Sequence, residues 1–175
     1  MADAFMFANG NLLKGKKFGC MESSLIALGG KPDKATSLLT QWRFLGASRE
    51  RLEELCGGID IFKYVGLRGV GELNVVEAGE TTAFLNNNLR RKLPTGALCT
   101  HLHDGTDSKV GHAFAILSPR AFPDNVWDRF LKQGAVPVFD INEPNQVSYH
   151  KTIREITTYL LTFREAMVLF LVKKE

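Results

Sequence analysis

The order of the predicted elements is the feature that most constrains the fold of this chain. Helical patterns fill the first third, over residues 20–29, 35–45 and 48–55, and strand patterns follow further along. The runs 97–103 and 110–117 flank a polar turn and predict an antiparallel hairpin. Helices that precede an antiparallel sheet are typical of the α+β class. We therefore expect an N-terminal helical lobe packed on an antiparallel β-sheet.

The other segments fit the same class. Their predicted elements, in chain order, are a strand over 59–65 that is broken by Gly66, Gly69 and Gly71, a helix over 81–92, a helix over 124–133, a strand over 136–139, a helix over 151–162 and a buried strand over 166–172. No repeat, low-complexity tract or linker divides the sequence. Residues 1–175 are accordingly expected to form a single domain.

Composition excludes several functional classes. The net charge of +3 is too small to indicate nucleic-acid binding. The longest apolar run near the end, 166–172, is far shorter than the ~20 residues that cross a bilayer, so we expect a soluble chain without a transmembrane segment. Three cysteines leave at least one free thiol, which favours a reducing compartment such as the cytoplasm. The glycines of 66–71 fit no phosphate or dinucleotide motif, and no cofactor is expected.

Three residues at the ends of these predicted elements are candidates for catalysis. Cys20 opens the first predicted helix, where unpaired amides and the helix dipole stabilise a thiolate. His112 heads a predicted strand and could take the thiol proton, and Asp140 ends another strand and could orient the imidazole. An oxyanion needs a further donor, and Asn11 is favoured over Asn9 among the upstream amides. The pattern predicts a cysteine nucleophile with its base and the orienting acid.

Two other interpretations use the same residues. Cys20 could be a buried, inert thiol in a binding domain, since a free cysteine is often a small core residue. His101 and His103 alternate along one predicted strand and His112 lies on its hairpin partner, so three imidazoles could converge on zinc. No cysteine pair or His-Glu motif accompanies them, and the prediction is therefore that no metal is bound.

The segments Gly19-Cys20, 111–116 (GHAFAI) and 139–142 (FDIN) resemble the active-site blocks of papain-like (clan CA) cysteine peptidases. The resemblance is closest to the YopT-type bacterial effector cysteine peptidases, in which a helix and a final strand also follow. Ile141 replaces the usual proline, the predicted helix over 124–133 lengthens the usual hairpin, and 14–15 (KG) lack the usual upstream amide.

The resemblance implies a papain-like fold and hydrolysis of a protein substrate by a Cys-His-Asp triad through an acyl-enzyme. It also implies delivery as a secreted virulence effector. The same triad could instead deamidate glutamine or transfer an acyl group. These activities, and the inert binding domain, remain the alternatives to a peptidase.

Overall fold

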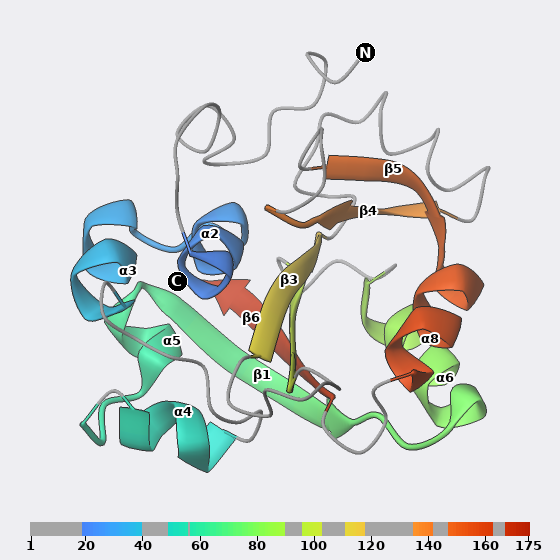
Figure 1. Ribbon diagram of the computed structural model, residues 1–175, viewed down its shortest axis with the longest axis horizontal. Helices are drawn as coiled ribbons and strands as arrows, with labels where there is room; N and C mark the ends of the chain where they lie inside the picture. Colours follow the sequence, from blue (N-terminus) through green and yellow to red (C-terminus); the bar gives the residue numbers. More distant parts are fainter. Residues whose placement is uncertain are drawn as a thin grey trace.

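The computed structural model describes residues 19–39, 49–55, 57–89, 96–102, 111–117, 135–141, 147–162 and 167–175. Its framework is one six-stranded sheet with the strand order β1-β6-β2-β3-β4-β5 (Figure 1). Each adjacent pair of strands runs antiparallel. The strands are β1 (Leu67–Asn74), β2 (Gly96–Leu102), β3 (Gly111–Leu117), β4 (Ala135–Phe139), β5 (Val147–Thr152) and β6 (Val168–Lys174). The expected α+β class with an antiparallel sheet is confirmed.

Helices cover both faces of this sheet. They are α2 (Cys20–Ala27), α3 (Pro32–Leu39), α4 (Arg49–Leu55), α5 (Ile61–Tyr64), α6 (Ala78–Leu89) and α8 (Ile153–Leu161). Buried residues of α2, α3, α4 and α5 pack against one face, whereas those of α6 and α8 pack against the other (Figure 1). The described helices thus form a layer on each side of the sheet, and the larger layer is N-terminal.

Strand β6 shows how the sequence produces this arrangement. Successive side chains of a strand point to opposite faces. Val168, Phe170 and Val172 accordingly join the core under the N-terminal helices, whereas Leu169 and Leu171 join the core under α6 and α8. A strand between two helical layers needs apolar side chains on both faces, so its sequence is a continuous apolar run rather than an alternating one.

The end of α2 depends on two glycines. Gly29 adopts a φ of 98°, a conformation that other residues rarely adopt. The N–H of Gly29 donates to the carbonyl of Ile26, and that of Gly30 donates to the carbonyl of Leu25 at 2.9 Å. This is a Schellman motif, and it satisfies carbonyls that the helix end would otherwise leave unpaired. The helix predicted over 20–29 is confirmed as α2.

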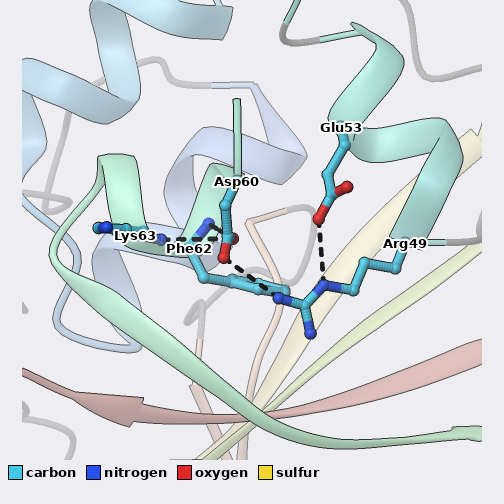
Figure 2. A network of polar contacts seen from close by, with 5 residues as sticks. All are labelled: Arg49, Glu53, Asp60, Phe62 and Lys63. Atoms are coloured by element: carbon cyan, nitrogen blue, oxygen red, sulfur yellow. Dashed lines mark hydrogen bonds and ion pairs between the residues drawn. The ribbon is translucent and has the colours of Figure 1, made fainter. Parts of the chain in front are cut away.

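The predicted strand over 59–65 is wrong, because a short helix, α5, occupies Ile61–Tyr64. The carboxylate of Asp60 accepts hydrogen bonds from the N–H groups of Phe62 and Lys63 and thereby caps the helix (Figure 2). Asp60 also forms an ion pair with Arg49 of α4 at 3.1 Å. This N-cap outweighs the strand preference of the β-branched and aromatic residues that follow it.

The predicted break at the glycines that follow is also wrong, since β1 runs through two of them. Gly66 makes the turn with a φ of 82°, and the register with β6 shifts between Gly69 and Gly71. A Cβ at Gly69 would lie 3.2 Å from the Arg49 guanidinium, and one at Gly71 would lie 3.3 Å from Leu171. These glycines allow close packing and a β-bulge within the strand rather than ending it.

The remaining predictions divide into three groups. The hairpin of 97–103 with 110–117, the strand over 136–139, the last helix and the last strand are confirmed as β2, β3, β4, α8 and β6, and the helix over 48–55 as α4. The helix expected over 81–92 is α6, which begins earlier, at Ala78; residues 90–92 lie outside the described residues. The helix expected over 35–45 begins earlier, at Pro32, and β5 was not predicted. The helix expected over 124–133 lies outside the described residues. Among the described residues, no helix is long and apolar enough to span a membrane.

Candidate active site

Cys20 is the first residue of α2, as the sequence predicts. Gly19 is the N-cap, with an extended backbone, and its carbonyl accepts the first helical hydrogen bond, from the N–H of Ser23 at 3.0 Å. The Glu22 carboxylate accepts from the N–H of Gly19 at 3.4 Å, which is the half of a capping box that a glycine cap permits. Because Cys20 occupies the first turn, its own N–H has no acceptor within the helix and is suited to bind an anion.

Two buried hydroxyls fix the first turn of α2 in place. Ser23 and Ser24 both donate to the carbonyl of Cys20, at 3.1 and 2.6 Å. Both side chains are fully buried, so these bonds also satisfy hydroxyls that burial would otherwise leave unpaired. The thiol of Cys20 is half-buried and packs against the core beneath the N-terminal helices. These bonds give both serines a role in positioning Cys20.

His112 and Asp140 are brought together by the pairing of β3 with β4. His112 is the second residue of β3 and Asp140 directly follows β4. In an antiparallel pair the start of one strand lies beside the end of the other. Nε2 of His112 lies 2.9 Å from Oδ2 of Asp140, and the two side chains are only 13% and 16% exposed. The topology therefore forms a largely buried histidine–carboxylate pair from residues that are distant in sequence.

The His112 side chain also forms a hydrogen bond with Cys20. Because Nε2 faces Asp140, Nδ1 is the ring nitrogen left for the thiol. Burial acts to lower the pKa of His112, but the hydrogen bonds and charges of Asp140 and Cys20 outweigh it and raise that pKa to about 9. A histidine with this pKa is protonated at neutral pH. The three predicted residues thus form one connected polar group with His112 at its centre.

An aromatic contact that the sequence interpretation missed supports the imidazole. The rings of His112 and Phe114 are nearly parallel, with centroids 6.2 Å apart and planes 27° apart. Phe114 in turn makes an edge contact with Tyr159 of α8, at 5.8 Å. The signal was present in the sequence, since residues two apart on a strand share a face. Phe114 thus packs beside the ring that joins Cys20 to Asp140.

The predicted oxyanion donor Asn11, its rival Asn9 and His103 lie outside the described residues. His101 is the register partner of His112 across β2 and β3. Within the described part of the chain, no three His, Cys, Asp or Glu side chains are placed to hold a metal ion. The geometry around His112 is that of a hydrogen-bonded chain leading to a carboxylate.

Cys99 provides an internal comparison for Cys20. It lies in β2, is completely buried and is not part of a disulfide. Burial raises the pKa of the Cys99 thiol well above its ordinary value. This environment indicates an inert packing role for Cys99, whereas Cys20 is half-buried and hydrogen-bonded to His112.

No family model matches this chain, and neither the curated proteins nor the solved structures give a match.

Proposed function

We propose that this chain is a thiol-dependent amide hydrolase, a cysteine peptidase that acts on a protein substrate. One observation carries the proposal: His112 is hydrogen-bonded to both the Cys20 side chain and the Asp140 carboxylate. A nucleophile, a base and an orienting group in hydrogen-bonded sequence are the arrangement required for covalent acyl transfer. The placement of Cys20 at a helix start, where a free backbone N–H can bind an oxyanion, adds support.

The proposed reaction follows from the protonation state of His112. With its pKa at about 9, His112 carries two N–H protons at neutral pH, one directed at Asp140 and one at Cys20. The Cys20 thiolate attacks the amide carbonyl carbon and forms a tetrahedral intermediate. The Cys20 N–H donates a hydrogen bond to its oxyanion. His112 then gives its Nδ1 proton to the leaving amine, and the C–N bond breaks to leave a thioester.

Deacylation reverses the roles of the same groups. His112 is now neutral and takes a proton from water, whose oxygen attacks the thioester carbonyl. The C–S bond breaks, the carboxylic acid leaves, and the thiolate–imidazolium pair is restored. Asp140 holds Nε2 throughout, so that Nδ1 faces the sulfur. The same steps on a glutamine side chain would release ammonia, and an amine in place of water would give acyl transfer.

The test is to incubate the purified chain with a mixed peptide library and to identify the products by mass spectrometry. We expect new peptide termini with the wild type and none with Cys20→Ala, while the matched variant Cys99→Ala retains activity. The rate is expected to fall above about pH 9, where His112 loses its proton. Glutamine deamidation or acyl exchange that depends on Cys20 would replace the peptidase by one of its alternatives. Equal turnover by the wild type and Cys20→Ala would refute the proposal.

A further inference from the structure

Basic side chains gather around the turn that joins α5 to β1. We define the basic face by six residues: Lys31, Lys34, Lys63, Arg68, Lys173 and Lys174. The elements that carry them meet at one end of the sheet, where α3, α5, the start of β1 and the C-terminal end lie together (Figure 1). This surface takes no part in the site around Cys20.

Specific contacts hold these residues around Gly66. The N–H of Lys31 donates to the Val65 carbonyl at 2.8 Å, and the Lys31 stem covers Gly66 at 3.2 Å from where a Cβ would stand. The N–H of Glu175 donates to the Gly66 carbonyl at 3.2 Å, which ties the end of β6 to the same turn. Lys63 lies in the last turn of α5, directly before it. The cluster is therefore fixed by the backbone rather than formed by chance extension of long side chains.

The other members lie at the same end of β1 and β6 but on both sides of the sheet: Lys174 shares the side of Val172, whereas Arg68 and Lys173 share the side of Leu171. The Lys34 ammonium lies 5.3 Å from the centroid of the Tyr64 ring, a cation–π contact beside the turn. The Lys174 stem lies over Gly29 at the end of α2. Arg68 and Lys173 are direct register partners across β1 and β6. Five of the six side chains are exposed and Lys173 is half-buried.

The positive charge of the basic face exceeds what nearby carboxylates and helix ends can neutralise. The C-terminal ends of α2 and α5 point to this region, and each helix end supplies at most roughly half a negative charge. The acidic side chains that the same elements contribute are Asp33 of α3, Glu72 of β1 and Glu175. Six cations against three carboxylates and two helix ends leave an excess of about two positive charges.

The Arg68–Lys173 pair is the clearest sign that this charge serves a partner. Like charges directly opposite each other on antiparallel strands destabilise the pairing. Within the described part of the chain, no carboxylate forms an ion pair with either residue. The fold therefore retains a repulsive pair at its surface, and an external anion would relieve the repulsion.

We propose that the basic face docks the protein on the surface of an anionic phospholipid bilayer. Five of the six cations are lysines, which act as point charges, whereas recognition of a single phosphorylated group favours the bidentate fork of arginine. Lysine-rich clusters of this size suit a diffuse, negatively charged lipid surface. Val70 is 45% exposed and follows Arg68 on β1, which places an apolar side chain beside the charges.

Docking by this face gives the protein a defined orientation. The basic face lies at the C-terminal end of α2 and Cys20 at its N-terminal end. Eight residues at 1.5 Å each separate the two ends by about 12 Å. The bilayer would then hold the Cys20 end of α2 away from the lipid surface. The docking proposal does not rest on the proposed function, since no residue of the basic face belongs to the Cys20–His112–Asp140 group.

Binding to vesicles tests the proposal. The full chain is mixed with phosphatidylcholine vesicles that contain or lack phosphatidylserine, and the bound fraction is measured by sedimentation. One basic residue near an anionic surface changes the partition coefficient about fivefold. Arg68→Gln and Lys63→Gln are each expected to reduce it by that factor. The matched control Arg154→Gln removes one exposed charge from α8, at the other end of the sheet, and is expected to change it less than about twofold (Figure 1).

Two further measurements sharpen the test. Raising the salt from about 0.1 to 1 M shortens the screening length from about 10 to 3 Å and is expected to abolish binding. Arg68→Glu places opposite charges on the register pair with Lys173, so its Tm is expected to rise while its vesicle binding falls. Binding that does not depend on phosphatidylserine would overturn the proposal. A loss of binding in Arg154→Gln equal to that in Arg68→Gln and Lys63→Gln would also overturn it. Binding to polyglutamate without binding to vesicles would do the same.

Discussion

The His112–Asp140 pair makes the stability of the fold depend on pH. The pKa of His112 is about 9 in the folded chain and 6.5 in a histidine without such contacts. A pKa that folding raises means that the folded state binds the proton more tightly than the unfolded chain. The resulting stabilisation is present in full below about pH 6.5 and is lost as the pH rises through about 9. At about 1.4 kcal/mol per pKa unit, the shift corresponds to about 3 kcal/mol.

Asp140→Asn tests this magnitude. The hydrogen bond to Asp140 is the largest of the contributions that raise the pKa of His112, and the Asp140 charge adds to it. Without that carboxylate, burial favours the neutral ring, because a buried cation without its partner is costly. Between pH 6 and pH 9.5, the free energy of unfolding of the wild type is expected to fall by about 2–3 kcal/mol more than that of Asp140→Asn.

The assay is urea unfolding followed by fluorescence at half-unit pH steps, with the wild type, Asp140→Asn and the control Asp33→Asn. Asp33 is an exposed aspartate in the first turn of α3, and its variant is expected to keep the pH dependence of the wild type. An NMR titration of the His112 ring supplies the pKa directly. The free energy of unfolding of the wild type minus that of Asp140→Asn is expected to fall with pH. If this difference stays constant from pH 6 to pH 9.5, or increases, the reasoning is refuted.

Three further predictions concern cysteine reactivity, close packing and capping. Iodoacetamide at pH 7 is expected to alkylate Cys20 in the folded chain and to leave Cys99 unmodified, because Cys99 is buried and its pKa is raised; peptide mass spectrometry reads both sites. Gly96→Ala is expected to lower the free energy of unfolding by about 3 kcal/mol, since its Cβ would collide with the Ile116 carbonyl oxygen. Asp60→Ala is expected to cost about 1–2 kcal/mol, measured by the same urea method, because it removes the cap of α5 and an ion pair.

Matched control variants distinguish these specific effects from a general loss of stability. Gly79→Ala has open space around its Cβ and lies in α6, so it is expected to stabilise the fold by about 0.5–1 kcal/mol. Glu53→Ala removes one ion pair of Arg49 but no helix cap, and is expected to change stability by less than about 0.5 kcal/mol (Figure 2). Alkylation of Cys99 as fast as Cys20, a Gly96→Ala variant as stable as the wild type, or equal effects at Asp60 and Glu53 would contradict the respective predictions.

Local patterns predicted the part of the fold in which each element is specified by its own residues. The β2–β3 hairpin follows from two runs of strand formers around a polar turn, and α2 ends where Gly29 allows it to end. Segment 59–74 could not be predicted in this way. There α5 depends on an aspartate cap that also binds Arg49 from another helix, and β1 exists because β6 pairs with it along its length. In such segments, long-range pairing determines the secondary structure even where local propensity favours a different one.

The candidate site likewise has features that the sequence could predict and features that it could not. The elements that carry Cys20, His112 and Asp140 could be predicted, because a helix start and two strand ends are visible as patterns. The roles of the two ring nitrogens could not, since they depend on the side of His112 that β4 occupies. The contact of Phe114 and the bonds of the Ser23 and Ser24 hydroxyls were missed although their spacings of two, three and four residues allow them, because spacing does not show which side chains use them.

Burial and charge at His112 together explain why this site is sensitive to single changes. A side chain that is only 13% exposed is protonated at neutral pH only if its partners offset the cost of burial, and here the partners are Asp140 and Cys20. The proton that stabilises the fold is also the proton that the proposed reaction gives to the leaving amine. Removing Asp140 should therefore shift the pH dependence of folding and that of activity in the same direction. A purely structural ion pair would shift only the first.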